Sequence, residues 1–321
     1  MAAALFGIVS GFNDGGNLIG SFTSGTVISP RGATVVLLAS LAGPLLIGTA
    51  VAQTLARNVI DLRGQGELGF VLITLAPLGV VLFSWRLGIP SSMTLALVGA
   101  MLGWVLAAAQ HSTIHWQGVV RVLIGMPISV IAGGLLALAA YASIRRLLGR
   151  LSNAAIIGLA RWQLVTASFQ AFAYGANDME KTVGLIAVAA AFSIHAAPAW
   201  FFGPVSAFAA FVLFYAGALI GGWRVARRVG FGVLKIRPMQ ALAQQLASGT
   251  VVSALALAGA PVSMTQTIDG GLVGVGAASR ASSIRWGIVR EMVGSWLLTL
   301  PISLVVAGAL HLIVRALGLA A

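Results

Sequence analysis

Four acidic residues that could do chemistry lie inside or beside apolar segments of this chain. The seven Asp and Glu residues include Asp14, Asp178, Glu180 and Asp269, which fall in such segments. A carboxylate at the centre of a bilayer costs roughly 2.5 to 3.5 kcal/mol on insertion scales, so such residues usually face a cavity, a partner charge or an ion. These four residues therefore predict a polar interior.

Two of the four carboxylates belong to a motif that occurs twice, as GFNDGGNLIG from Gly11 and as GANDMEKTVG from Gly175. The flanking glycines permit local unwinding, which would free backbone carbonyls to join carboxylate and amide oxygens around a hard cation such as Na⁺. Asp14 and Asp178 are the predicted Na⁺ ligands. Simple polar pairing across a helix interface is the alternative. The full predicted cation-coupling group is Asn13, Asp14, Asn17, Asp178, Glu180 and Asp269.

A second motif also occurs twice, as IPSSMTLALVGAMLG from Ile89 and as APVSMTQTIDGGLVG from Ala260. Proline fits the first turn of a helix and Ser or Thr can cap it, and the free N–H groups of such a helix start favour an anion. The hydroxyls could donate hydrogen bonds to a tetrahedral oxyanion, although ordinary capping would also explain them. The predicted donors are Ser92, Thr94, Ser263 and Thr265.

The two copies of the first motif differ at Lys181, because Asn17 occupies the equivalent place in the first copy. A lone lysine near the membrane centre could be a substrate counter-ion, or it could neutralise Asp178 or Glu180 in a packed network. Both interpretations stay open. The four histidines show no metal-ligand spacing, and none is assigned to the site.

The segments that must position these residues are membrane spans. Of 321 residues, 59% are hydrophobic and 8% are charged, which is far below the charge content of an ordinary soluble domain. Apolar stretches that meet the roughly 20-residue helical requirement of a bilayer recur along the chain. These stretches are apolar all round rather than alternating, which predicts helices and not a barrel. The predicted spans are Ala33 to Leu55, Leu68 to Trp85, Gly118 to Tyr141, Trp200 to Gly222 and Trp286 to Ile313.

The basic residues indicate topology rather than a nucleic-acid partner. The formal net charge is +12, but the basic residues cluster between the apolar spans. Cytoplasmic loops carry an excess of Lys and Arg, so both dense clusters are predicted to face the cytoplasm. They comprise Arg145, Arg146 and Arg150, and Arg224, Arg227, Arg228, Lys235 and Arg237. No cysteine is available for a disulfide or a thiolate metal site.

The repeated motifs divide the chain into two related halves, 1–150 and 151–321. Both motif pairs keep the same order and nearly the same separation, which two unrelated coincidences would not do. Repeated halves whose apolar segments are interrupted by Gly and Pro at corresponding places are typical of transporters with broken helices near the bilayer midplane. We therefore predict a secondary transporter for a small inorganic anion.

These motifs resemble those of the inorganic phosphate transporter (PiT) family, whose halves each carry a Gly-x-Asn-Asp segment and a Pro-Val-Ser-Thr-Thr-His segment. The resemblance is strong at Gly175–Asp178, at Lys181-Thr182-x-Gly184, and from Pro261-Val262-Ser263 through Gly274-Val275-Gly276 to Arg285-Trp286. It implies an all-α polytopic membrane protein of two inverted repeats with broken helices and re-entrant hairpins. The implied function is phosphate symport with Na⁺ or H⁺ by a homodimer, in the inner membrane of a prokaryotic cell and without enzymatic activity.

The resemblance also assigns residues and leaves alternatives. The implied substrate-binding set is Ser92, Thr94, Asn177, Lys181, Ser263, Thr265 and Gln266. Leu95 and Gln266 replace the family's usual histidines. Sulfate is the alternative substrate because related permeases carry it. A membrane hydrolase using Asp14 and Asp178 as acid and base would lack a nucleophile paired with a histidine, and a passive anion channel is the third possibility.

Overall fold

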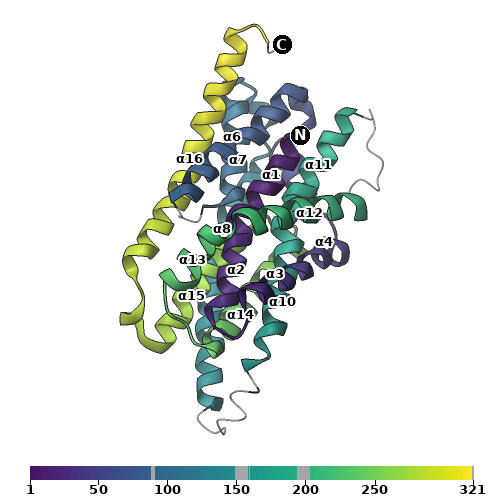
Figure 1. Ribbon diagram of the computed structural model, residues 1–321. Coiled ribbons are helices and arrows are strands. Elements are labelled where there is room, and N and C mark those ends of the chain that lie inside the picture. Colours follow the sequence, from purple (N-terminus) through teal and green to yellow (C-terminus); the bar gives the residue numbers. More distant parts are fainter. Residues whose placement is uncertain (88–90, 149–157, 159, 194–202, 320–321) are drawn as a thin grey trace.

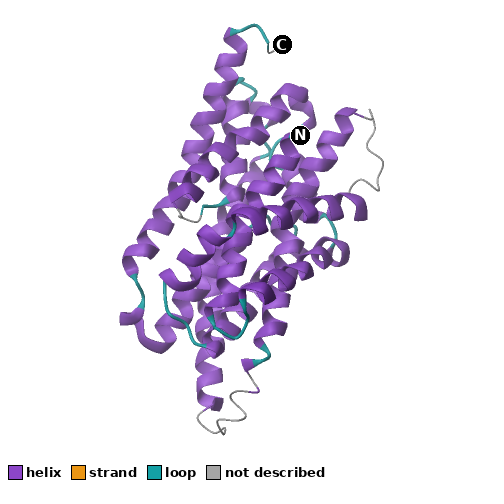
Figure 2. Ribbon diagram, in the orientation of Figure 1, coloured by secondary structure: helices purple, strands orange, loops and turns teal. Residues whose placement is uncertain are grey.

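The part of the chain that the structure describes is helical throughout, apart from connecting turns and one isolated bridge between Ile60 and Ile114. The computed structural model describes residues 1–87, 91–148, 158, 160–193 and 203–319 (Figures 1 and 2). The predicted boundary at 150/151, Arg150 and the start of the span at Trp200 lie outside these residues. The division into two halves therefore stays a prediction from the sequence.

The two halves contain corresponding elements in the same order. Those of the first half are α1 (Ala2–Ser10), η1 (Gly11–Gly15), α2 (Gly16–Ser24), α3 (Pro30–Val36), η2 (Leu37–Leu41), α4 (Ala42–Ile47), α5 (Ala50–Arg57), η3 (Arg63–Gln65), α6 (Gly66–Leu87), α7 (Met93–Ala107), η4 (His111–Thr113) and α8 (Trp116–Leu148). Those of the second are α10 (Gln163–Tyr174), η5 (Gly175–Met179), α11 (Glu180–Ser193), α12 (Pro204–Gly221), α13 (Trp223–Gly232), α14 (Pro238–Leu257), α15 (Met264–Arg280), η7 (Ala281–Ser283) and α16 (Trp286–Ala316).

Helices of each half pack against helices of the other half. Helix α7 packs against α16 of the other half, and α15 packs against α8 in the same way. Likewise α12 contacts η1 while α4 contacts η5, and α13 contacts α2 while α5 contacts α11. The halves are thus interleaved around a shared centre rather than folded as two separate lobes. This reciprocal packing is what a two-fold relation between the halves requires, and their inversion across the membrane stays a prediction.

Five helical segments among the described residues are long and apolar enough to cross a membrane: Pro30–Ile47, Arg63–Leu87, Trp116–Leu147, Pro204–Gly221 and Trp286–Ala316. Four of them confirm predicted spans. The predicted span Ala33 to Leu55 was wrong as one continuous helix, because the chain breaks after α4 and restarts as α5. Gly48 lies at the break with a φ of 98°, a conformation that glycine adopts without steric cost.

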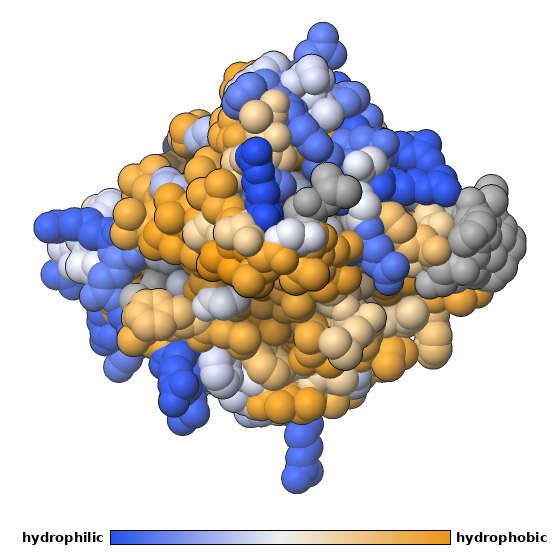
Figure 3. Space-filling view, turned by 90° about the horizontal axis from the view of Figure 1, so that it is seen from above, coloured by the Kyte–Doolittle hydropathy of each residue, from blue (hydrophilic) through white to orange (hydrophobic). Residues whose placement is uncertain are grey.

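The outer faces of the long helices are apolar. Ile131 and Leu135 on α8, and Leu297 and Val305 on α16, expose more than half of their surface. Seen from above, large hydrophobic areas cover the visible face and hydrophilic residues gather in patches between them (Figure 3). Because a monomeric soluble protein rarely exposes such large apolar patches, these faces are the ones that contact lipid.

The last turn of α8 carries Arg145 and Arg146 of the first basic cluster, and this end of α8 lies toward the bottom of Figure 1. Arg145, near the end of α8, donates to the carbonyl of Ala278 at 3.1 Å. Arg285 donates from its backbone to the carbonyl of Val233 at 3.0 Å and from its side chain to Gly232, both of which follow the basic run of α13. That the two clusters face the same side of the membrane, and that this side is the cytoplasm, stays a prediction.

Candidate functional site

Both Asn-Asp motifs form a wide helical turn in the middle of a longer helix. The π-helical turns η1 and η5 each join two α-helices without leaving helical backbone angles. The expected unwinding at the glycines is therefore replaced by a local widening of the helix. Such π-turns are frequent at functional sites because one extra residue per turn displaces side chains and carbonyls from the regular helical ladder.

Glycines at the start of each wide turn allow another backbone to approach. A Cβ added to Gly11 would overlap the carbonyl oxygen of Phe214 on α12, and one added to Gly175 would overlap the carbonyl oxygen of Ser40 on η2. The two approaches are equivalent in the two halves. They hold each Asn-Asp turn against the helix that follows the corresponding motif in the other half.

The asparagine of each motif binds the segment that leads into a short buried helix. Asn13 donates to the carbonyl of Ser91 at 2.7 Å and accepts from its N–H at 3.2 Å. Asn177 donates to the carbonyl of Ala260 at 3.0 Å and accepts from the N–H of Val262 at 3.0 Å. Both amides therefore position the starts of α7 and α15, and this positioning occupies the side chain of the predicted substrate residue Asn177.

The predicted helix starts are confirmed at both Pro-x-Ser-Met-Thr segments. Ser92 caps α7 by accepting from the N–H of Leu95 at 3.2 Å, and Ser263 caps α15 by accepting from the N–H of Gln266 at 3.5 Å. Both helices begin among fully buried residues. Two helix N-termini, which favour negative charge, thus lie inside the protein next to the Asn-Asp turns.

Asp178 and Lys181 form a buried ion pair at the start of α15. One carboxylate oxygen of Asp178 accepts from the N–H of Met264 at 2.9 Å, and the other accepts from the ammonium of Lys181. Lys181 also donates to the carbonyl of Val262 at 2.9 Å, and Thr94 of the first half donates to the same carbonyl at 3.1 Å. Of the two roles left open for Lys181, this structure shows the neutralisation of Asp178.

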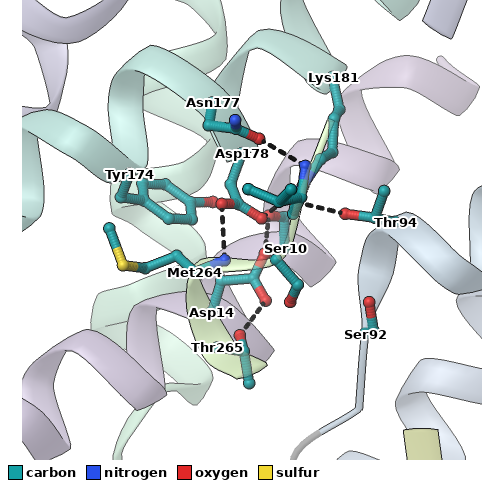
Figure 4. A network of polar contacts seen from close by, with 12 residues as sticks. Ser10, Asp14, Ser92, Thr94, Tyr174, Asn177, Asp178, Lys181, Met264 and Thr265 are labelled. Carbon is teal, nitrogen blue, oxygen red and sulfur yellow. Dashed lines mark hydrogen bonds and ion pairs between the residues drawn. The ribbon is translucent and has the colours of Figure 1, made fainter. Parts of the chain in front are cut away.

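Asp14 has a different environment, because its hydrogen-bond donors are uncharged. It accepts from the hydroxyl of Ser10 at 2.8 Å, from the amide of Asn13 at 2.8 Å and from the hydroxyl of Thr265 at 3.1 Å. Figure 4 shows Asp14 and Asp178 approaching the first turn of α15 from the two halves. The halves thus meet at α15, and only the second contributes a positive charge to this cluster among the described residues.

The cluster contains two carboxyl groups, those of Asp14 and Asp178, and one ammonium group, that of Lys181. With Asp14, Asp178 and Lys181 ionised, the buried cluster carries one excess negative charge. Uncompensated charge is costly in the membrane interior, and the cluster therefore favours a bound cation.

Two polar atoms beside the cluster have no hydrogen-bond partner among the described residues. They are the side-chain oxygen of Asn17 and the hydroxyl of Ser91, both fully buried. The amide nitrogen of Asn17 donates to the carbonyl of Asn13 at 3.0 Å and faces Thr265 at 3.5 Å. The free oxygen of Asn17 therefore lies beside the residues around Asp14, which supports its predicted role as a cation ligand.

Sequence reasoning missed Ser10, Ser91 and Tyr174. The hydroxyls of Ser10 and Tyr174 lie 2.9 Å apart and connect the two helices that contain the Asn-Asp motifs. Each precedes its aspartate by four residues, Asp14 and Asp178 respectively, and this spacing places both members of a pair on one helix face. That spacing could have identified Ser10 and Tyr174 from the sequence. Ser91 differs from an ordinary loop serine only in preceding Ser92, the N-cap of α7.

Three predicted site residues lie outside this cluster. Glu180 accepts from the N–H groups of Val51 at 3.0 Å and Ala52 at 3.1 Å, and so caps the start of α5. The side chain of Gln266 lines a pocket between α8 and α16, together with Leu95. Asp269 lines a neighbouring pocket of the same helices. The structure thus brings together Asn13, Asp14, Asn17, Ser92, Thr94, Asn177, Asp178, Lys181, Ser263 and Thr265.

The fold and the site define a multi-pass helical membrane protein in which two π-turns and the starts of α7 and α15 meet around buried charges. The chain matches the model of the phosphate transporter family over residues 10–307. It belongs to that family, which is a family of transporters and not of enzymes.

Relatives of similar length support the same family. The chain is 33% identical over 308 residues to a probable low-affinity inorganic phosphate transporter of Rhizobium meliloti, covering 93% of this chain and 90% of the relative. It is 30% identical over 312 residues to a protein of the same description from Bacillus subtilis, covering 94% and 92%. A solved structure described as the sodium-dependent phosphate transporter superposes with a TM-score of 0.85 at 18% identity, covering 98% and 97% of the two chains. The predicted fold class of a multi-pass helical membrane protein is confirmed.

Proposed function

We propose that this chain is a secondary active transporter that carries inorganic phosphate across the membrane together with Na⁺. The observation that carries the proposal is a buried cluster of two carboxyl groups and one ammonium group beside two helix N-termini. The family and the descriptions of its curated relatives support phosphate as the substrate. The sodium dependence stated for the structurally similar transporter supports Na⁺ as the coupling ion.

In this proposal the cation binds first, between the two halves. The carboxylate of Asp14 and the free oxygen of Asn17 provide hard oxygen ligands, and Asp178 provides a second carboxylate. Two like charges about 4 Å apart repel each other by about 4 kcal/mol at an effective dielectric constant of about 20. Phosphate therefore meets less repulsion after Na⁺ has neutralised the excess charge, and this order couples the two ions.

Phosphate then binds at the starts of α7 and α15. Ser92, Thr94, Ser263 and Thr265 lie there, and Lys181 provides a positive charge. In the observed conformation Thr94 and Lys181 donate to the carbonyl of Val262, and Thr265 donates to Asp14. Binding of phosphate exchanges these internal partners for phosphate oxygens. Gln266 contributes through the capped turn, where its N–H faces Ser263.

Uptake of labelled phosphate into proteoliposomes tests this proposal. An inward Na⁺ gradient should drive accumulation above the external concentration, and replacement of Na⁺ by an impermeant cation should abolish it. Accumulation that follows an imposed pH gradient and ignores Na⁺ would replace Na⁺ by H⁺ as the coupling ion. Downhill flux that ignores both gradients would contradict symport and indicate a passive channel.

Competition by sulfate tests the choice of anion. Phosphate carries a proton that can donate to an acceptor such as a carboxylate, and a site built for that proton penalises an anion without one. A large excess of sulfate should therefore compete poorly with phosphate. Equal competition would contradict the choice of phosphate over sulfate.

The proposal includes a homodimer in the inner membrane of a prokaryotic cell. The bacterial origin of the curated relatives supports this location. The mass of the protein in native membranes, measured after mild cross-linking, tests the dimer. A monomer under conditions that preserve Na⁺-driven uptake would contradict it.

A further inference from the structure

Asp269 is a buried carboxyl without any hydrogen-bond partner among the described residues. Both of its oxygens lack a donor, although the side chain is 3% exposed. The indole N–H of Trp296 on α16 is also buried and unpaired. Buried polar groups in native proteins are nearly always paired, and an ionisable residue inside a membrane protein indicates function. An unpaired carboxyl therefore requires an explanation.

Asp269 and Trp296 line the same pocket, which has a volume of about 370 Å³ and lies between α8, α15 and α16. Apart from Asp269, its lining consists of glycine, alanine, valine, leucine, isoleucine, methionine and tryptophan residues, whose side chains carry no oxygen and no charge. Ile131 and Leu135 are exposed on the apolar face of α8. The pocket thus lies next to the lipid-facing surface.

Charged residues on the surrounding helices have other partners or lie on the surface. Glu291 on α16 pairs with Arg228, and Arg145 on α8 donates to the carbonyl of Ala278. Arg290 on α16 and Arg280 on α15 are exposed. Helices α14 and α2 carry no charged residue. Among the described residues, no charged side chain forms an ion pair or a hydrogen bond with Asp269.

This environment excludes most ligands of a carboxylate. A metal cation requires several oxygen ligands, and the pocket offers only those of Asp269. An ionised carboxylate without any partner is costly at membrane depth, whereas a protonated one is neutral. A proton needs no further ligand. We propose that Asp269 is a proton-binding site, separate from the Asn-Asp cluster, and that its proton must be bound for α15 to pack as observed.

Helix α15 connects this site to the candidate transport site. Asp269 follows Thr265 by four residues, so the two side chains lie one helical turn apart on one face. Thr265 donates to Asp14 at 3.1 Å. Loss of the proton from Asp269 would favour conformations in which α15 exposes this carboxyl to water, and such a movement would displace Thr265. Proton binding and the state of the Asp14 site are then coupled, a step that rests on the proposed function.

Chemical labelling tests proton binding without relying on transport. A protonated carboxyl in an apolar, lipid-side pocket adds its O–H across a C=N bond of dicyclohexylcarbodiimide, and rearrangement gives a stable N-acylurea. In protein reconstituted into phosphatidylcholine vesicles, the peptide that contains Asp269 should gain the mass of one carbodiimide. The exposed Glu67 should stay unmodified, and labelling should decline as the pH rises. An unmodified Asp269 under these conditions would overturn the proposal.

The pH profile of phosphate uptake tests the coupling. Asp269→Asn mimics the protonated side chain, so the ratio of variant to parent uptake should increase from mildly acidic to mildly alkaline pH. Because variant and parent are assayed with the same phosphate solution at each pH, the titration of phosphate itself does not change the ratio of their uptake. The matched control Glu67→Gln should give a constant ratio, because Glu67 lies at the surface. A constant ratio for Asp269→Asn would overturn the coupling, and if that variant fails to fold, the labelling of the parent chain decides.

Discussion

Replacement of Asp178 by Asn should destabilise the protein far more than the same replacement at Asp14. Asp178 neutralises Lys181, whose side chain is 1% exposed, whereas Asp14 accepts only from uncharged donors. The Asp178→Asn substitution would leave the ammonium buried without a counter-charge. Removal of one partner from a buried ion pair typically costs about 3 to 5 kcal/mol. The Asp14→Asn substitution should cost about 1 kcal/mol, the range of a neutral hydrogen bond.

Thermal unfolding of the purified variants in detergent, without Na⁺ and phosphate, measures this difference. The double variant Asp178→Asn/Lys181→Met removes both charges, and it should recover much of the stability lost in Asp178→Asn. The coupling free energy of the double-mutant cycle separates the pair from the backbone bond of Asp178 to Met264. Equal stability of the Asp178→Asn and Asp14→Asn variants would refute the assignment of the ion pair to Asp178 and Lys181.

The structure also predicts the outcomes of four further experiments. Asp14→Asn should raise the Na⁺ concentration for half-maximal uptake by roughly tenfold or more, equivalent to at least about 1.4 kcal/mol, and unchanged Na⁺ dependence in folded protein would contradict a cation ligand. Thr265→Ala should raise the half-saturating phosphate concentration about fivefold, as expected for the loss of about 1 kcal/mol, and an unchanged value would contradict its place in the site. Gly175→Ala should lower the free energy of unfolding by about 3 kcal/mol or more, because the added Cβ would overlap the carbonyl oxygen of Ser40. The control Gly79→Ala should be tolerated, because a Cβ at Gly79 would face open space. Two single-cysteine variants of this cysteine-free chain test the predicted orientation in the membrane. Ser283→Cys, which precedes α16, should resist an impermeant maleimide added outside intact cells, whereas Ser112→Cys, which precedes α8, should react. The reverse pattern would contradict the predicted cytoplasmic location of the basic clusters.

The main features of the fold could be predicted because lipid imposes simple constraints on sequence. Long apolar runs predicted four spans. The paired motifs marked the two helices that contain π-turns, although the unwinding predicted at their glycines was wrong. The span from Ala33 to Leu55 was wrong because hydropathy does not register backbone conformation. A single glycine with positive φ, Gly48, ends the helix without lowering the hydrophobicity of the segment.

The site could be predicted in part, for residues whose role follows from local sequence. The serine caps follow from the local pattern Pro-x-Ser, and both were found in place. The partners of Asp14 and Glu180 depend on contacts between distant segments. Thr265 lies in the other half of the chain, and the start of α5, which Glu180 caps, exists only because the chain breaks at Gly48. Sequence spacing carries no information about such contacts.

Reversal of phosphate flux by Na⁺ tests the central claim most directly. Proteoliposomes are loaded with labelled phosphate at the external concentration, and Na⁺ is then imposed in either direction with the membrane potential clamped. Na⁺ symport predicts net phosphate uptake under an inward Na⁺ gradient and net release under an outward gradient. In folded Asp14→Asn protein both responses should require a higher Na⁺ concentration. Phosphate that stays at equal concentration on both sides, whatever the direction of the Na⁺ gradient, would contradict coupling through the buried Asp14 and Asp178 cluster.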